Sequence, residues 1–471
     1  MRRVDRRTAV LVVAILASSI GYIDSTALTV ALPSIRTHGD AQSQWIIQSY
    51  LLPLAALIGL GGALGDRFGR RRMLALGTWI FILASIGCAL APGAAVLIAT
   101  RFVQGAGAAL MIPESLALIT AAYEDPAEFG RATGLWASAS AATMAAGPLL
   151  AGWLTPYSWR LVFCINIPLG AAVLVLAYLR VPESRKAVQR GRLDLLGAAA
   201  MTAALSLIVA GLMAMSRSVR PEAVAALLAG LLLLAVFVAV ERKAEDPVIP
   251  LRLFAIRRFA VANIYTLFFY AALGGVLVFV PFELQRVMHY SSPDAGLALL
   301  PAIGIIAFCS PTAGLLSGRF GARPFLILGA AISAAGYALF VLLGTHAAFM
   351  TAVLPAMLVL GAGVALAAAP LTAATMSAAG ADDLGAASGI SNSVSRIGNL
   401  VGLAALGIAM AMDGGHALPA PSHHAGFRDA MLCAAALALA AALVAVFLPP
   451  ARKREASALR RNPGEQAEAT V

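Results

Sequence analysis

The most regular feature of the chain is a series of long apolar stretches separated by short polar segments. Most are about 20 residues long, the length at which an α-helix crosses a hydrocarbon core of ~30 Å. There are fourteen: 8–32, 44–64, 73–92, 96–122, 132–154, 160–179, 193–215, 222–240, 258–282, 295–317, 324–344, 348–374, 385–411 and 427–448. Because lipid offers no hydrogen bonds to the backbone, these stretches are predicted to be membrane-spanning helices in an all-α membrane protein.

Basic residues are concentrated in every second connection between these predicted helices. Of the 34 Lys and Arg residues, 26 lie in the terminal segments and in the connections on the side of the N-terminus, whereas six lie on the other side. Cytoplasmic loops carry such an excess. The pattern therefore predicts a multi-pass protein of the plasma (inner) membrane with both termini cytoplasmic. On this view the net charge of +11 reflects topology, and we expect no nucleic-acid partner.

Composition and missing motifs narrow the class of protein. The chain is 60% hydrophobic and 12% charged, with a mean hydropathy of +0.86, which is far from the composition of a soluble domain. It contains no phosphate-binding Gly-x-x-x-x-Gly-Lys loop, no His-Glu-x-x-His zinc motif and no nucleophile elbow. We therefore expect neither an enzyme nor an ATP-driven pump, and no metal or cofactor.

A short basic segment occurs twice, at 62–77 and 314–329, with glycines and an Arg-Phe pair repeated at an offset of 252. Each copy lies between two apolar stretches, so we expect a tight turn between two helices. Parallel six-helix halves are a known transporter plan. The sequence predicts an N-terminal six-helix bundle (1–180), a linker with two inserted helices (181–257), a C-terminal six-helix bundle (258–449) and a cytoplasmic tail (450–471).

Four further segments have distinctive sequences. They are Tyr-Ile-Asp-Ser-Thr-Ala-Leu-Thr-Val-Ala-Leu-Pro-Ser-Ile at 22–35, Arg-Phe-Val-Gln-Gly-Ala-Gly at 101–107, Gly-Pro-Leu-Leu-Ala-Gly at 147–152, and Trp-Arg-Leu-Val-Phe-Cys-Ile-Asn-Ile-Pro-Leu-Gly at 159–170. In these four segments and in the segment at 62–77, the chain resembles the fourteen-helix drug/proton antiporter family of the major facilitator superfamily. The resemblance covers residues 8–448.

This resemblance implies a secondary active transporter that exports lipophilic or cationic drugs in exchange for protons, by alternating access. Its partners would be a small-molecule substrate, protons and the lipid bilayer, with the proton gradient in place of a cofactor, and we expect a monomer. Two alternatives remain. One is a transporter of a specific metabolite, and the other is a non-transporting membrane sensor, which predicts a soluble signalling domain that the sequence lacks.

Asp24, Arg101 and Glu114 are the candidate proton-coupling residues within predicted helices. Asp24 lies about 12 Å from the outer end of its helix at 1.5 Å per residue, and Arg101 enters from the same side, so the two side chains are expected to meet. A charge inside a span faces a cavity or a partner. The pair is interpreted as a proton-coupling site, with a static ion pair as the alternative. Glu114 is a second protonation site, a contact for cationic substrates, or an acid that reaches the cytoplasmic interface.

The first copy of the repeated segment, residues 62–77, is called the cassette below. Its expected role is a conformational latch on the cytoplasmic side, formed by Gly62, Asp66, Arg67, Gly69, Arg70 and Arg71. Glycines permit close approach, Asp66 can accept bonds from helix amides or an arginine, and the arginines face the anionic leaflet. Gly318 replaces Asp66 in the second copy, so only the N-terminal half carries the full charge latch. Direct substrate contact is the alternative.

Two further groups of residues complete the candidate sites. Gly147, Pro148 and Gly152 belong to the antiporter-motif helix; the resemblance implies that its bend seals the two halves, although Thr143 and Ala151 stand where glycines are expected. The candidates for the substrate path are Gln48, Tyr50, Asn392, Ser395, Arg396 and Asn399. The last four share one helical face, and hydrogen bonding between helices is the alternative to lining a path.

Overall fold

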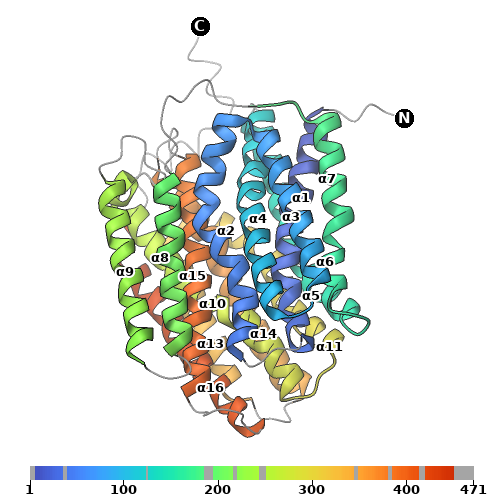
Figure 1. Ribbon diagram of the computed structural model, residues 1–471. Helices are drawn as coiled ribbons and strands as arrows, with labels where there is room; N and C mark the ends of the chain where they lie inside the picture. The colour runs from blue at the N-terminus through green and yellow to red at the C-terminus, as the bar shows by residue number, and fades with distance from the viewer. Residues whose placement is uncertain are drawn as a thin grey trace.

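The computed structural model describes residues 6–35, 40–123, 126–184, 195–215, 220–242, 251–343, 348–379, 384–412 and 420–449. Every regular element among them is a helix, and the long helices run roughly parallel or antiparallel to one another (Figure 1). The first elements are α1 (Arg6–Ala31), η1 (Leu32–Ser34), α2 (Asp40–Phe68), α3 (Arg70–Leu90), α4 (Ala94–Ala122), α5 (Pro126–Leu154), α6 (Leu161–Cys164), α7 (Asn166–Arg180), α8 (Leu195–Met215) and α9 (Pro221–Glu241).

The later elements are η2 (Leu251–Ala255), α10 (Arg257–Arg286), α11 (Ser292–Ala298), α12 (Leu300–Phe320), α13 (Ala322–Val341), η3 (Phe349–Val353), α14 (Leu354–Ala378), α15 (Leu384–Met412) and α16 (Ala420–Val446). Two predicted single helices are divided. The stretch 160–179 forms α6 and α7, which meet at Ile165, and the stretch 295–317 belongs to α11 and α12, which meet at Leu299.

Twelve helices in the described part of the chain are long and apolar enough to cross a membrane. The predicted count of fourteen is therefore not confirmed. The predicted stretches 132–154 and 193–215 do form helices, α5 and α8, but neither is among the twelve. The protein is nonetheless a multi-pass membrane protein.

The helices pack mainly with neighbours from their own part of the sequence. In the first group, α1–α7, α4 packs against α2 and α3, and α1 packs against α5 and α7. In the second group, α10–α16, α14 packs against α12 and α13, while α16 packs against α10 and α13. The remaining two, α8 and α9, pack on each other, and α8 also contacts α2 and α15 (Figure 1). Contacts between the two groups run through α2 with α15, α5 with α11, and α1 with α10.

Both copies of the repeated segment form the same tight turn. Gly69 joins α2 to α3 with φ 109°, and Gly321, its counterpart at the offset of 252, joins α12 to α13 with φ 83°. Residues with a side chain rarely adopt such positive φ values, so glycine is needed at both positions. We call the end of the bundle that holds the α2–α3 turn the cassette end, and the opposite end, with the α3–α4 turn, the far end.

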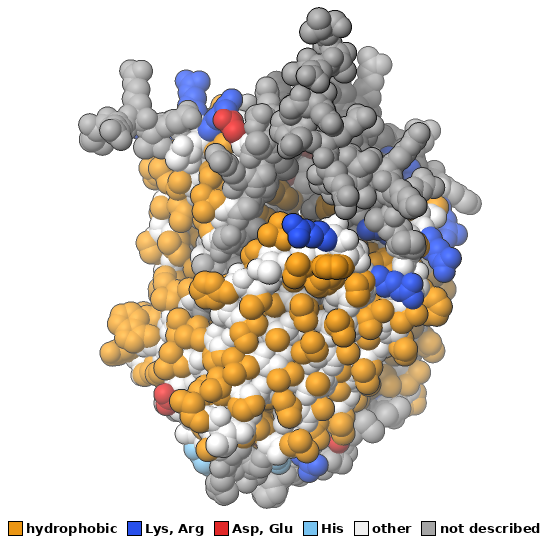
Figure 2. Space-filling model, turned by 180° about the vertical axis from the view of Figure 1, so that it is seen from behind, with side chains coloured by type: hydrophobic (Ala, Val, Ile, Leu, Met, Phe, Trp, Pro, Cys, Tyr) orange, Lys and Arg blue, Asp and Glu red, His pale blue; other side chains and the backbone are white. Residues whose placement is uncertain are grey.

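The outer surface suits a lipid environment. Figure 2 shows a broad band of hydrophobic side chains on the visible face, with most of the visible Lys and Arg toward the upper end. The large exposed apolar side chains include Leu196, Leu232, Phe308 and Leu342. Because hydrocarbon chains solvate such side chains as well as a protein interior does, their exposure carries no penalty within a bilayer.

Close helix contacts in the second group depend on glycine, and Gly402→Ala tests this. A Cβ at Gly402 would lie 2.1 Å from the carbonyl oxygen of Ala271, so α10 and α15 would have to separate. We expect the substitution to destabilise the protein by about 1–3 kcal/mol, measured by thermal unfolding in detergent. Gly304→Ala is the matched control because nothing lies within 4 Å of its Cβ position. Equal unfolding temperatures for the two variants would contradict the packing argument.

Candidate functional site

An ion pair between Asp24 and Arg101 joins α1 to α4 inside the first group. The Arg101 Nη1 atom donates to Asp24 Oδ2, and the exposed fractions of the two side chains are 0% for Asp24 and 1% for Arg101. The two helices pack directly against each other, and this contact brings the two side chains together. The structure thus places both predicted residues in one site and pairs them.

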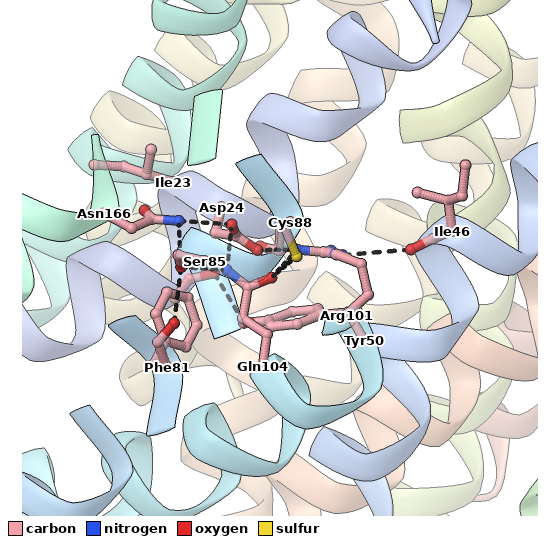
Figure 3. Close-up of polar contacts among 12 residues, drawn as sticks. Ile23, Asp24, Ile46, Tyr50, Phe81, Ser85, Cys88, Arg101, Gln104 and Asn166 are labelled. Atoms are coloured by element: carbon pink, nitrogen blue, oxygen red, sulfur yellow. Dashed lines mark hydrogen bonds and ion pairs between the residues drawn. The ribbon is translucent and has the colours of Figure 1, made fainter. Parts of the chain in front are cut away.

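Two amide side chains from other helices complete the surroundings of Asp24 (Figure 3). Its Oδ1 accepts a hydrogen bond of 2.8 Å from Asn166 Nδ2 at the start of α7 and one of 3.0 Å from Gln104 Nε2 on α4. Hydrogen bonds to an ionised group are roughly twice as strong as neutral ones. One buried carboxylate therefore receives donors from two helices besides the guanidinium group, and α1 is held by α4 and α7 together.

Ser85 on α3 extends the network. Its Oγ lies 2.8 Å from Gln104 Nε2 and 3.3 Å from Asn166 Nδ2, and it donates to the carbonyl oxygen of Phe81 at 2.8 Å. The Gln104 Oε1 atom accepts from Arg101 Nη1 at 2.8 Å. The same amide therefore contacts both members of the ion pair and links them to Ser85 on α3.

Arg101 is also enclosed by aromatic rings. Its Cζ lies 4.3 Å from the centre of the Tyr50 ring on α2 and 5.8 Å from that of Phe163 on α6, while its Nε donates to the Ile46 carbonyl oxygen at 3.4 Å. Desolvated cation–π contacts contribute about 2 kcal/mol. The guanidinium group thus has contacts with α2 and α6 that do not involve its carboxylate partner.

Glu114 is buried at the α2–α4 contact, near the cassette end. Its side chain is 1% exposed, and neither carboxyl oxygen has a hydrogen-bond partner among the described residues. A Cβ at Gly65 would lie only 2.1 Å from Glu114 Oε1, so glycine at position 65 makes room for the carboxyl group. The side chain is therefore enclosed between α2 and α4 within the first group, close to the charged residues of the cassette.

The latch residues are tied to neighbouring helices of the first group. Arg70 Nη2 lies 2.9 Å from Asp66 Oδ1, and Arg70 Nη1 donates to the carbonyl oxygen of Ala117 on α4. The Arg70 backbone nitrogen donates to the carbonyl oxygen of Ser184 at 2.8 Å. A Cβ at Gly62 would lie 3.9 Å from Pro113 Cβ, an ordinary contact distance, and the Cζ atom of the exposed Arg67 lies 5.6 Å from the centre of the Phe68 ring.

Glu183, which follows α7, is a cassette partner that the sequence analysis missed. Its Oε1 accepts from the Arg71 backbone nitrogen at 3.1 Å, and its Oε2 lies 3.6 Å from Arg71 Nε and 3.7 Å from Arg72 Nε. A Cβ at Gly69 would meet the Glu183 carboxyl carbon at 2.6 Å. The signal available in the sequence is a lone acid at the start of a basic linker.

The antiporter-motif helix contacts both groups of helices. A Cβ at Gly147 would lie 2.0 Å from the Thr26 hydroxyl oxygen on α1, close to Asp24. Gly152 approaches Pro293 in α11, where a Cβ would lie 2.9 Å from the Pro293 Cα, and the Pro148 carbonyl oxygen faces Gly296 at 2.6 Å from its Cβ position. The motif therefore lies between α1 of the first group and α11 of the second.

The predicted path residues occupy different surroundings. Gln48 donates to the Leu400 carbonyl oxygen at 3.1 Å, which links α2 to α15, and the Tyr50 hydroxyl donates to the Gly21 carbonyl oxygen at 3.2 Å. The exposed Asn392 accepts from Ser395 through its backbone oxygen at 2.8 Å.

Asn399 and Arg396 lie on the same helix, α15. Asn399 packs against Gly274 of α10. Arg396 is half-buried, and among the described residues its Nε has no hydrogen-bond partner. Helix-to-helix bonding therefore accounts for Gln48 but not for Arg396.

Polar contacts between the two groups gather toward the far end. Gln285 Nε2 donates to the Val30 carbonyl oxygen at 3.0 Å, and Arg286 Nη2 donates to the Pro33 carbonyl oxygen at 3.1 Å. Both donors lie at the end of α10, and both acceptors lie at the α1–η1 junction. Together with the α5–α11 contact, they close the far end between the two groups.

The chain is similar in sequence to proteins named for drug resistance or export. It is 35% identical over 398 residues to Multidrug resistance protein Stp of Mycobacterium tuberculosis (strain CDC 1551 / Oshkosh), covering 83% of this chain and 73% of that protein. It is 34% identical over 452 residues to Cephamycin export protein CmcT of Amycolatopsis lactamdurans, covering 94% and 92%. With the Lincomycin resistance protein of Streptomyces lincolnensis, identity is 36% over 389 residues, covering 81% and 80%.

Solved transporter structures share the fold. A bacterial homolog to the human lysosomal transporter Spinster, in an inward-facing and occupied conformation, superposes with a TM-score of 0.70 at 18% identity, over 95% of this chain and 97% of that one. The D-xylose-proton symporter gives 0.64 at 18% identity, over 94% and 98%. The family model of the Major Facilitator Superfamily matches residues 14–403 and, a second time, 306–470. The chain is therefore a transporter and not an enzyme, and it belongs to the Major Facilitator Superfamily.

Proposed function

We propose that this transporter exports lipophilic drugs across the plasma membrane in exchange for protons, by alternating access. Support for drug export comes from the relatives, whose names include multidrug and lincomycin resistance. Support for proton coupling comes from one observation, the buried Asp24 carboxylate with its guanidinium and amide donors. Asp24 is shielded from bulk water and is bonded to side chains of α4 and α7, which favours a role in proton coupling.

In the proposed cycle, the proton binds the Asp24 carboxyl group and removes its negative charge. The ion pair with Arg101 is then lost, while Arg101 keeps its contacts with Gln104 and the Tyr50 ring. The neutral acid makes weaker hydrogen bonds to Asn166 and Gln104, because only the ionised form gives charge-assisted bonds. Helix α1, which contacts α10 of the second group, is thereby released from α4 and α7.

Glu114 is the proposed second protonation site. A buried carboxyl group without a hydrogen-bond partner is far more costly as an anion than as a neutral acid, so a proton there offsets the cost of burial. Arg70 and Asp66 of the cassette are near enough to interact with it electrostatically. We propose that charge at Glu114 alters the Asp66–Arg70 pair and thereby the latch at the cassette end.

The sequence also predicts cationic substrates, with Glu114 as a possible contact. In the structure Glu114 lies behind Gly65, between two helices of the first group. Asp24, the other buried acid of the site, is already paired with Arg101. Neither carboxyl group is offered to a substrate cation, so the proposal covers lipophilic substrates and does not extend to cations as a class.

We also propose that α5 and α8 cross the membrane, which gives fourteen spans with both termini cytoplasmic in a monomer. The helices contain 29 and 21 residues, and each packs along a candidate span, α5 on α1 and α8 on α9. The proposed divisions are residues 1–180 and 258–449 for the two bundles, 181–257 for the linker with the inserted pair, and 450–471 for the tail.

Everted membrane vesicles test the coupling. With an imposed pH gradient, acid inside, addition of a transported drug is expected to release protons from vesicles that contain the protein, and to release none from vesicles of the same strain without it. The measurement is the recovery of a pH-sensitive dye during addition of a broad panel of lipophilic antibiotics and antiseptics. Accumulation of drug without any proton movement would contradict antiport.

A further inference from the structure

Arg396 is a half-buried cation inside a membrane helix, and among the described residues its Nε has no hydrogen-bond partner. It lies in α15, seven residues after Gly389, the first residue of the candidate span Gly389–Met410, which corresponds to about 10 Å along the helix. Within the described part of the chain the guanidinium group forms no ion pair. An arginine at mid-membrane costs several kcal/mol unless a partner or water compensates its charge.

The contrast with Arg101 shows what is missing at Arg396. Arg101 has a carboxylate, an amide oxygen, a backbone carbonyl and two aromatic rings around its guanidinium group. Both arginines lie within electrostatic range of Tyr50, whose ring covers Arg101. Asp24, the acid that also interacts with Tyr50, is paired with Arg101 and is not available to Arg396.

Helices from both groups meet around Arg396, because α15 packs against α10 of its own group and against α2 of the first group. Tyr270 on α10 interacts electrostatically with Arg396 and with Tyr22 on α1, and Tyr50 on α2 also interacts with Tyr22. These residues lie where α1 and α2 of the first group meet α10 and α15 of the second. Alternating access changes this contact, so a substrate bound here would be exposed to each side in turn.

We propose that Arg396, with Tyr22 and Tyr270, binds an anionic group of the transported compound, such as a carboxylate or sulfonate. Guanidinium offers only hydrogen-bond donors, in a planar arrangement that matches two oxygens of such a group, and each tyrosine can donate one hydroxyl hydrogen. The place of Arg396 seven residues inside the candidate span Gly389–Met410, about 10 Å along the helix from the nearer end, sets the site apart from lipid phosphates. The inference rests on the proposed drug export and specifies the chemical class of its substrate.

Three probes with the same fluorophore test the charge preference. They are dansylglycine, which carries a carboxylate, dansylglycinamide, which is neutral, and dansylcadaverine, which carries an ammonium group. Binding to the purified full-length protein in nanodiscs is measured by equilibrium dialysis, with empty nanodiscs subtracted. The wild-type protein is expected to bind dansylglycine at least about tenfold more tightly than dansylglycinamide, as for one charge-assisted interaction.

The variant R396Q is expected to remove this tenfold preference while it leaves the affinity for dansylglycinamide within twofold. R396K keeps the charge without the planar donors, so it should retain part of the preference. R220Q is the matched control because it removes one positive charge at the exposed start of α9, and it should bind all three probes as the wild type does. If R396Q fails to fold, the affinities of R396K and of the wild type for the three probes still test whether Arg396 binds an anionic group.

Equal affinity of the wild type for dansylglycine and dansylglycinamide would overturn the proposal, and so would an unchanged preference in R396Q. A preference for dansylcadaverine would overturn it as well. Transport is a separate readout: an Arg396-dependent preference without proton-driven movement of any probe would support the anion site and contradict the proposed export. Proton-driven movement with no Arg396-dependent preference would support export and reject the anion site.

Discussion

Asp24→Asn is expected to reduce proton-driven efflux by at least about 100-fold, the scale on which a positioned proton-transfer group contributes to a rate. Asparagine has nearly the same shape, and its Oδ1 can still accept from Asn166 and Gln104. The buried Arg101 loses its carboxylate partner but keeps its contacts with Gln104 and the Tyr50 ring, so we expect D24N to be less stable than the wild type and still to reach the membrane. Asparagine cannot take up and release a proton. The measurement is drug efflux in energised cells, together with the amount of protein in the membrane.

The matched control for this prediction is Asp294→Asn at the exposed start of α11, which removes a carboxylate near Ser291 outside the buried site. It should transport at the wild-type rate. Counterflow of labelled drug without a proton gradient separates coupling from binding, because D24N should still exchange drug across the membrane. Wild-type active efflux in D24N would remove this residue from the coupling mechanism.

The second large effect is expected for Arg101→Gln, which leaves the Asp24 carboxylate buried without its cation. Removing one partner of a buried ion pair costs about 3–5 kcal/mol, because the other charge stays desolvated. The cation–π contact with Tyr50 is lost as well. We expect a large fall in the unfolding temperature of the detergent-purified protein, followed by tryptophan fluorescence, and little folded protein in the membrane.

The double variant D24N/R101Q distinguishes an ion-pair effect from lost packing. Because neither charge remains in the double variant, it should be more stable than R101Q alone, although it carries one more substitution. The coupling energy from the four proteins of this cycle measures the pair directly. If the two single losses simply add, the charge on Asp24 does not cause the instability, and the ion-pair argument is wrong.

The pattern of apolar and polar residues along the chain predicted most of the helices and one contact of the site, that between Asp24 and Arg101. The positions of the apolar stretches gave most helix ranges, and the depths of Asp24 and Arg101 in their helices predicted their meeting. Gln104 could have been predicted in the same way, because it lies about one helical turn after Arg101 and therefore lies on the same face of the helix. An isolated polar residue three positions from a charged residue in an apolar helix therefore indicates that the two side chains belong to the same polar site.

Other parts of the site depend on which helices become neighbours, which periodicity does not specify. Ser85 and Asn166 come from α3 and α7, and only the packing of these helices on α1 and α4 brings them to Asp24. Glu183 meets the cassette because the chain returns to that end after α7. Gln48 has the polarity of a path residue, yet in the structure it links α2 to α15.

The two ends of the bundle are held by different kinds of interaction. At the far end, side-chain donors of Gln285 and Arg286 meet backbone carbonyl oxygens, and α5 touches α11 through glycine and proline. At the cassette end, partly exposed ion pairs such as Arg70–Asp66 and Arg71–Glu183 predominate. Dissolved ions screen pairs of charges but hardly affect neutral contacts. The uncharged contacts at the far end, the Gln285 hydrogen bond and the packing of α5 on α11, should therefore persist as ionic strength changes on the side that we propose faces the external medium. The Arg286 contact on that side and the ion pairs at the cassette end should weaken as salt is added.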